Sequence, residues 1–475
     1  MDEPKNTKIV ALTRRAWIDR CCCSFLLLIG SILLLFACSN GTDPSTPPQS
    51  PDPNNSGTGP LPPSGYNHIN DTGIAGLACV NSDLNLVDCT LTTALAGQDG
   101  NSGYDVTFPD SSDGLLGFRF TKLKNDGLAL SDQKVSYDTT PWSCVRDENT
   151  GLVWEVKTPS GSGLHDVRND YTWYFSDSAK NLGAEGTPCS ITTDTCDTQR
   201  YIDAVNSEAL CGHSDWRLPT LYELSTLRDF GSQGLDPALD TQFFANEEGK
   251  LYWTSTNTSV NSLQAYAIWF VGVDSLNTSN VLRDNIAHLK SARAHIRLVH
   301  GGQAFPLDNY DSCNLASIEG QQAPSSRFTL NNDGTVSDKL TGLMWKRCSE
   351  GQSENNNDCT GGIDKSINTF NLALETATNS QFAGYDDWRV PNVKELSSLF
   401  EPLCSASPMI NWDVFPSTIY DANYWTSSVV VQAAGTTPNI WRANFKLENK
   451  ITNPFVSAVN ASGVVNYLRL VRDSQ

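Results

Sequence analysis

One pattern of hydrophobic and polar residues occurs twice in the chain, at residues 215–227 and again at 387–399. In each copy an extended run ends at a proline, because the residue before a proline is pushed out of the α region. Thr220 or Asn392 then stands where its side chain can cap a helix, and a glutamate follows three residues later, which is typical of a capping box. Leucines three residues apart come next and share one helical face. Both segments are therefore predicted to form a strand, a turn and the start of a helix whose leucines lie in the core.

The residues around this pattern repeat with it. Tyr-Trp-Thr-Ser and Arg-Leu-Val recur at the same offset of 172 residues, from Tyr252 and Arg297 in the first copy. Upstream, Thr-Gly-Leu-x-Trp recurs at an offset of 191, so the first copy holds 19 extra residues before its central segment. A shared offset over some 85 residues indicates a duplicated segment. We expect a first domain at 118–302, a linker at 303–324 and a second domain at 325–475.

The N-terminus is typical of an exported lipoprotein. Arginines precede an apolar run from Cys21 to Phe36, which fits the core of a signal peptide better than a membrane span. A small residue and Cys38 follow, which resembles the bacterial lipoprotein signal and implies that residues 1–38 end in an acylated cysteine. An uncleaved anchor helix is the alternative, and it also leaves the bulk of the chain outside the cytoplasm. Ser39 after the cysteine resembles outer-membrane sorting, so we expect an envelope protein held on the outer membrane by its lipid.

Two segments separate this anchor from the first domain. Residues 39–66 are dense in Pro, Ser, Gly, Asn and Asp and cannot bury enough apolar surface to offset the entropy of ordering, so they are predicted to be a disordered tether. Residues 67–117 are rich in loops and contain Cys79 and Cys89. We expect them to form a small disulfide-tied region that caps the first domain.

The cysteine count favours disulfides. Of 14 cysteines, three lie in the signal peptide core and Cys38 takes the lipid, which leaves ten in an exported chain. No Cys-x-x-Cys occurs after the signal, so a zinc site built from cysteines is disfavoured. The candidate pairs are Cys79/Cys89, Cys189/Cys196 and Cys348/Cys359 by proximity, and Cys144/Cys211 and Cys313/Cys404 by elimination.

Charge and turn chemistry restrict partners and cofactors. The net charge of −20 repels nucleic acid, so no nucleic-acid partner is expected. Asn-Asp-Gly at 125–127 and at 332–334 supplies the positive-φ positions of a tight hairpin. Calcium is conceivable at these turns, but the alternating acidic loop with a terminal glutamate is missing, so no motif supports a cofactor.

The repeated tryptophans and charged residues admit two interpretations. Aromatic rings can stack on sugars, and arginine can hold a carboxylate or sulfate through two hydrogen bonds. A tryptophan in an alternating strand is more often core, and an arginine beside Asp215 or Asp387 is expected to form a structural ion pair. We therefore expect structural roles for the repeated set, which is Trp216, Arg217, Glu223, Trp253, Arg297, Trp388, Arg389, Glu395, Trp425 and Arg469.

These repeated elements resemble the Lcl C-terminal domain family, also called DUF1566. The matching elements are the hairpin before Thr-Gly-Leu-x-Trp, the Asp-Trp-Arg-Leu-Pro-x-x-x-Glu-Leu segment, Tyr-Trp-Thr-Ser and the closing Arg-Leu-Val, over 118–302 and 325–472. Arg-Leu-Pro-Thr followed by Glu is also similar to the formylglycine-generating-enzyme and C-type-lectin-like group. The resemblance implies an α+β fold of two tandem C-type-lectin-like domains with small antiparallel sheets, stabilised by disulfides and each closed by its last strand.

The resemblance implies binding rather than catalysis. The named member of the family is part of a collagen-like bacterial surface adhesin that binds sulfated polysaccharide, whereas this chain has no collagen tract and is acidic. The formylglycine-generating relatives need a cysteine pair near the end of the domain, and residues 252–299 and 424–471 contain no cysteine. The six histidines are scattered without a pair at metal-ligand spacing, and His213 before Asp215 is interpreted as structural. We expect no enzyme activity and no metal.

Two functions remain open at this point. The first is non-enzymatic adhesion to a glycan, matrix or protein ligand, for which the divergent loops between Tyr252 and Arg297 and between Tyr424 and Arg469 are the best candidates. The alternative is a structural or assembly lipoprotein of the envelope whose partner belongs to the same cell.

Overall fold

The computed structural model describes most of the two repeats. It covers residues 69–102, 113–115, 117–161, 163–176, 183–185, 197–232, 237–258, 261–271, 285–302, 327–364, 367–401, 409–419, 422–431, 438–445, 456–460 and 466–474. The expected signal peptide, tether and linker lie outside these ranges, as do Cys38, Cys189, Cys196, Cys313 and Cys404. None of the helices within the ranges combines the length and hydrophobicity needed to span a bilayer.

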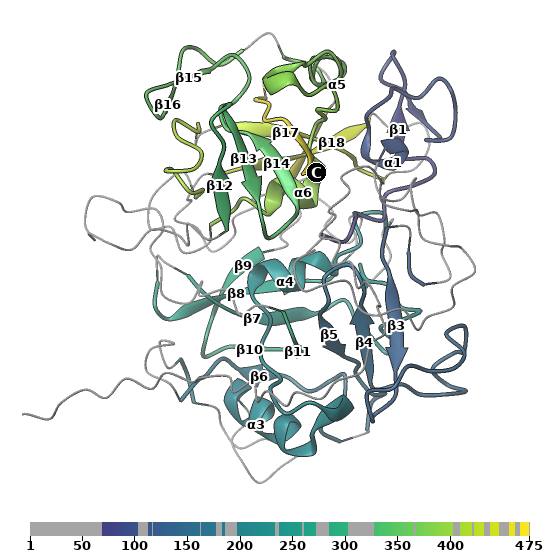
Figure 1. Ribbon diagram of the computed structural model, residues 1–475. Coiled ribbons are helices and arrows are strands. Elements are labelled where there is room, and N and C mark those ends of the chain that lie inside the picture. Colours follow the sequence, from purple (N-terminus) through teal and green to yellow (C-terminus); the bar gives the residue numbers. More distant parts are fainter. Residues whose placement is uncertain are drawn as a thin grey trace, which may run out of the picture. The chain divides into compact units, whose positions relative to one another are not determined.

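The first repeat is built on two small antiparallel sheets (Figure 1). The strand order in the first sheet is β11-β5-β4-β3, comprising β3 (Phe120–Leu123), β4 (Cys144–Asp147), β5 (Val153–Glu155) and β11 (Val299–His300). The second sheet consists of β7 (Leu251–Asn257), β8 (Gln264–Trp269) and β9 (Asn285–Leu289), and β6 (Tyr171–Thr172) pairs with β10 (Arg293–Ala294). Strand β11 pairs with β5 through Val299 and Trp154, so the end of the repeat returns to its beginning.

The second repeat has the same plan. Its four-stranded sheet has the order β12-β13-β14-β20, comprising β12 (Phe328–Leu330), β13 (Thr335–Asp338), β14 (Leu343–Lys346) and β20 (Val471–Asp473). Its three-stranded sheet consists of β17 (Asn423–Val429), β18 (Asn439–Asn444) and β19 (Val456–Asn460), and β15 (Ser353–Asn355) pairs with β16 (Asp358–Thr360). The pairing of β7 with β8 shifts register after Trp253, and that of β17 with β18 shifts after Trp425. The two repeats therefore share the same register shift, at corresponding tryptophans.

The helices also correspond. They are α3 (Thr198–Glu208) and α4 (Leu221–Thr226) in the first repeat, and α5 (Phe370–Thr378) and α6 (Val393–Ser397) in the second. Both predicted capping boxes are present, since Thr220 and Asn392 each accept from the backbone N–H of the glutamate three residues later, and that glutamate accepts from the cap's own N–H. The short helices α4 and α6 thus begin where the sequence pattern predicts.

The first hairpin differs between the repeats. In the second repeat β12 turns directly into β13 through Asn332-Asp333-Gly334, with Gly334 at φ 83°. In the first repeat a turn forms at Gly127, but the chain after it makes only a bridge from Ala129 to Leu123, and the partner of β3 is the later strand β4. Strand β4 corresponds to β13 at the offset of 191 residues, so the inserted residues lengthen the loop between the two arms of the hairpin.

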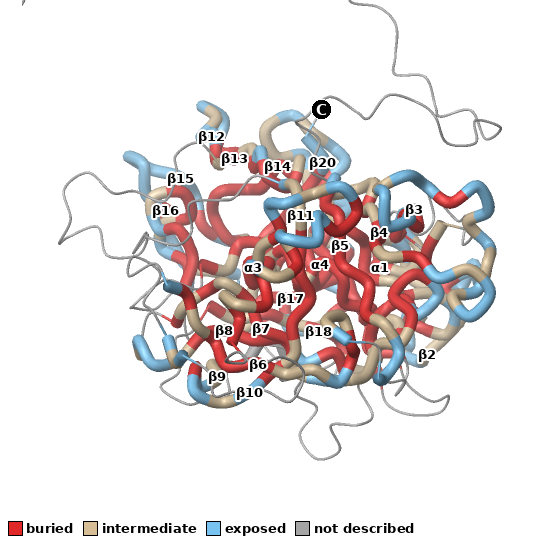
Figure 2. The backbone as a smooth tube through the Cα atoms, turned by 90° about the horizontal axis from the view of Figure 1, so that it is seen from below, coloured by how far each residue is buried: buried red, intermediate tan, exposed pale blue. Residues whose placement is uncertain are grey.

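The hydrophobic core follows the duplication. Buried positions concentrate along β7, β8, β17 and β18 (Figure 2). Trp216 donates from its ring N–H to the carbonyl of Leu210 at 2.9 Å, and Trp388 donates to the carbonyl of Phe382 at the same distance. The two tryptophans therefore occupy matching surroundings. Small antiparallel sheets with short helices place the protein in the α+β class.

The segment before the first repeat contacts both repeats. It contains β1 (Cys79–Val80), β2 (Leu86–Val87) and α1 (Asp99–Ser102). Asn70 donates to Asp147 of the first repeat at 2.6 Å. Ile74, Ala78 and the Cys79–Cys89 disulfide lie in a core cluster made mostly by the second repeat, a contact that was not expected. Lys394 of the second repeat in turn donates to the carbonyl of Thr226 of the first at 2.9 Å. The two repeats therefore touch, as the short linker predicts.

Three expected disulfides are formed. They are Cys79–Cys89, Cys144–Cys211 and Cys348–Cys359. The second of these ties β4 to the turn after α3, across a sequence separation of 67 residues.

Candidate functional site

The repeated tryptophans lie inside the protein rather than on a binding surface. Trp216 and Trp388 are 2% and 3% exposed, and Trp253 and Trp425 are fully buried. The indole N–H of Trp253 donates to the carbonyl of Tyr171 at 2.8 Å, and that of Trp425 to the carbonyl of Ile367 at 3.3 Å. Such rings anchor strand β7 or β17 to the core, and no sugar can stack on them.

The repeated arginine after the tryptophan pairs with the capping glutamate. Arg217 donates two hydrogen bonds to Glu223, at 2.7 and 2.6 Å, and Arg389 donates two to Glu395, at 2.6 and 2.7 Å. The expected structural ion pairs are therefore formed, but the partner is the capping glutamate rather than the neighbouring aspartate. Asp215 is 72% exposed, whereas the glutamate carboxylates are almost buried, where an ion pair is screened less by solvent.

The closing arginines bind main-chain carbonyls. Arg297 is 1% exposed and donates to the carbonyl of Glu155 in β5, while its other terminal nitrogen pairs with Glu247. Arg469 is fully buried and donates to the carbonyl of Lys346 in β14 at 3.1 Å. Burial lowers the pKa of Arg297 to about 10, which leaves the guanidinium charged at neutral pH. Both arginines therefore fasten the last segment of a repeat to its first sheet.

A buried polar network surrounds Glu155 in the first repeat. Its carboxylate accepts from Lys157 Nζ at 2.8 Å, from the backbone N–H of Leu298 at 3.0 Å and from the Tyr201 hydroxyl, and it contacts His165 Nδ1 at 2.8 Å. Burial alone would raise the pKa of Glu155, but Lys157 and His165 outweigh it and lower the pKa well below its ordinary value. Glu155 is fully buried, so a substrate cannot reach this carboxylate.

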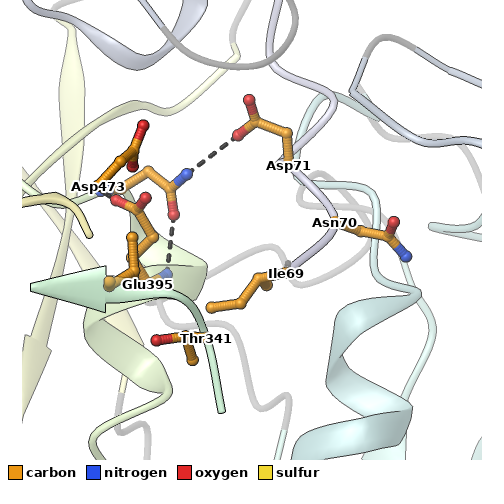
Figure 3. A pocket seen from close by; sticks show the side chains of 8 residues that line it. Ile69, Asn70, Asp71, Thr341, Glu395 and Asp473 are labelled. Carbon is orange, nitrogen blue, oxygen red and sulfur yellow. Dashed lines mark hydrogen bonds between the residues drawn. The ribbon is translucent and has the colours of Figure 1, made fainter. Parts of the chain in front are cut away.

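A small cavity lies where the N-terminal segment meets the second repeat (Figure 3). It is lined by Ile69, Asn70, Asp71, Thr341, Leu343, Asn392, Glu395 and Asp473. Asn392 donates to Asp71 across it at 3.0 Å. Its volume of about 20 Å³ suits a water molecule and is far below that of a small-molecule site.

Two exposed leucines lie at one end of the β8–β9 pair. Leu263 and Leu289 are 68% and 49% exposed there. Leu289 pairs with Gln264 in the register of β8 and β9, and the backbone N–H of Lys290 donates to the carbonyl of Leu263 at 2.9 Å, so the two leucines occupy diagonal positions on neighbouring segments. Both leucines lie between Tyr252 and Arg297, in one of the two stretches expected to bind a ligand. Residues 259–260, 272–284, 432–437, 446–455 and 461–465 of these stretches lie outside the described ranges.

The fold also brings together three side chains that can ligate a metal, His213, Asp215 and His300. Asp215 and His300 are 85 residues apart in sequence, yet His300 Nδ1 lies 2.7 Å from Asp215 Oδ1. Local spacing of histidines could not predict this cluster. The cluster forms because the residue Arg217 pairs with Val299 of β11. The sequence shows the two motifs that contain these residues but does not show that they pair.

Comparisons with known proteins agree with the duplication. No curated protein and no solved structure matches the chain. The family model of the Lcl C-terminal domain matches residues 143–300 and again residues 334–472. These matches span the two repeats and more than half of the chain, so the protein belongs to the Lcl C-terminal domain family and carries the domain twice.

Proposed function

We propose that the protein is a lipid-anchored envelope protein that binds a glycan, matrix or protein ligand without catalysis. The observation that carries this proposal is the exposed pair Leu263 and Leu289 on a stretch that has diverged between repeats. Both leucines expose apolar surface that a partner could bury, and apolar surface of this kind occurs at interaction sites. The anchor would be an acylated Cys38 on the outer membrane, and the segment at 39–66 would hold the folded part away from the bilayer.

We also infer that each repeat has a C-type-lectin-like fold. The return of the closing strand to the first sheet, through Val299 with Trp154 and Val471 with Trp345, supports this assignment. In such a fold the sequence of the loops between the Tyr-Trp-Thr-Ser and Arg-Leu-Val motifs can vary, because the residues that hold the core belong to the motifs and not to these loops. An experimental structure whose topology differs from that of C-type lectins would refute the assignment.

Binding is tested with the full-length chain in detergent on arrays of glycans and matrix proteins. Leu263→Ser combined with Leu289→Ser should abolish a signal seen with the unaltered chain. Leu330→Ser is the matched control, because Leu330 is 43% exposed on β12 of the other repeat. Absence of binding to every ligand, or equal loss in the control, would count against the proposal.

Exposure on the cell separates this function from a structural or assembly role. Protease treatment of intact cells should release the folded part of a surface adhesin and spare a protein that faces the periplasm. Cys38→Ser should move the protein out of the membrane fraction if the lipid is its anchor. Retention of this variant in the membrane would instead favour the uncleaved anchor helix.

A further inference from the structure

Three side chains of the first repeat lie close enough to share one metal ion. A ring nitrogen of His213, a ring nitrogen of His300 and a carboxylate oxygen of Asp215 all lie within 4.8 Å of one another. The two imidazole rings are stacked, with centroids 3.5 Å apart and planes inclined by 15°. Asp215 is 72% exposed and His300 19%, so solvent reaches the cluster.

The backbone that carries these side chains is fixed by independent contacts. Arg217 and Val299 exchange two backbone hydrogen bonds, of 3.0 and 2.9 Å, and this bridge sets Asp215 beside His300. The N–H of His213 donates to the carbonyl of Leu210 at 3.1 Å. Cys211, two residues before His213, is held by its disulfide with Cys144. The backbone positions of the three ligands are therefore held in place before any ion arrives.

The second repeat places a permanent cation at the corresponding position. Tyr385, Asp387 and Arg472 stand 172 residues after His213, Asp215 and His300. The Arg472 guanidinium donates to both carboxylate oxygens of Asp387, at 2.6 and 2.9 Å, and lies 4.0 Å from the Tyr385 ring centroid. The shared scaffold thus accommodates a positive charge between a ring and an aspartate. In the first repeat the ring and the cation are both replaced by imidazoles.

We propose that His213, Asp215 and His300 bind a zinc ion. Two imidazole nitrogens and one carboxylate oxygen match the ligands of zinc sites that keep an open position. The lone pairs of stacked rings run parallel, so the rings must rotate to converge on one ion, and the exposure of the cluster leaves room for that movement. Calcium and magnesium prefer oxygen ligands and are not expected to compete.

The test is a zinc titration of the full-length chain, purified in detergent without a histidine tag and stripped with EDTA. Isothermal titration calorimetry should show one zinc ion per chain. His213→Tyr combined with His300→Arg, which installs the pair found in the second repeat, should weaken binding at least about tenfold. His288→Gln is the control, because His288 packs on Trp253 outside the cluster and should not alter zinc affinity.

Two further measurements keep the result interpretable. Melting temperatures measured in EDTA show whether each variant is folded. Asp215→Asn removes the carboxylate ligand alone, by an isosteric change at an exposed position, and should also weaken zinc binding. Cobalt substitution should give visible absorption bands that the double variant lacks. Equal zinc uptake by the unaltered chain and the folded double variant, or no uptake by the unaltered chain, would overturn the proposal. Neither outcome depends on whether the protein binds an adhesion ligand.

Discussion

Neutralising Glu155 should be far more damaging than neutralising its neighbour Glu208. Both carboxylates contact His165, at 2.8 and 3.1 Å, but Glu155 is fully buried and Glu208 is 53% exposed. Glu155 also holds the ammonium group of Lys157, which is only 4% exposed. Glu155→Gln keeps the side-chain shape and leaves that ammonium buried without its main counter-charge.

The expected magnitudes follow from this difference in burial. Removing one partner of a buried ion pair costs about 3–5 kcal/mol, because the remaining charge is not compensated. A repeat of this size loses roughly 2–4 °C of melting temperature per kcal/mol, so Glu155→Gln should lower the melting temperature by about 6–20 °C. An exposed pair is worth less than about 1 kcal/mol, so Glu208→Gln should lower it by less than roughly 4 °C.

Differential scanning calorimetry of the full-length chain measures both effects. The lowered pKa of Glu155 gives an independent check, because a depressed carboxyl pKa adds stability that is present above about pH 4.5 and is lost as pH falls. The Gln variant should lack this acid-dependent part. Similar melting temperatures for the two variants at neutral pH would refute the reasoning that burial decides the cost.

Two other predictions concern different parts of the chain. Burial, and then the nearby charge of Asp71, raise the pKa of Asp99 to about 8, so the folded protein holds a proton there that the unfolded chain releases above about pH 4. Stability should therefore fall by about 1.4 kcal/mol per pH unit as pH rises toward 8, and calorimetry of Asp99→Asn should show a flatter profile. Replacing both cysteines of Cys144–Cys211 by alanine should cost about 4 kcal/mol, against about 3 for Cys348–Cys359, because their loops span 67 and 11 residues. Equal losses in melting temperature for the two cysteine variants would argue against the loop-entropy account.

Structures that depend on residues close together in the sequence could be predicted. Contacts that depend on which distant strands pair could not. The capping boxes at Thr220 and Asn392 depend on residues three positions apart, so the pattern locates both helices. The partner of Arg217 was missed because the turn at the helix start carries the glutamate back toward the strand, while Asp215 contacts His300 instead. The metal-ligand cluster was missed for a related reason, since it exists only once β11 has paired.

Comparison of the two repeats separates residues that hold the fold from residues that can carry chemistry. The tryptophans, the arginine–glutamate pairs and the closing arginines are the same in both repeats, and all are buried except the arginines of the pairs, which are 27% exposed. Each supports the shared backbone. Other positions on the same backbone carry side chains of different charge in the two repeats. Glu155 of the first repeat corresponds to Lys346 of the second, and His300 corresponds to Arg472. Arg472 always carries its own positive charge, whereas the His300 ring nitrogen can serve as a metal ligand, so the first repeat is the one that can hold an external cation at this position. A function that distinguishes the repeats should therefore follow these substitutions rather than the shared motifs.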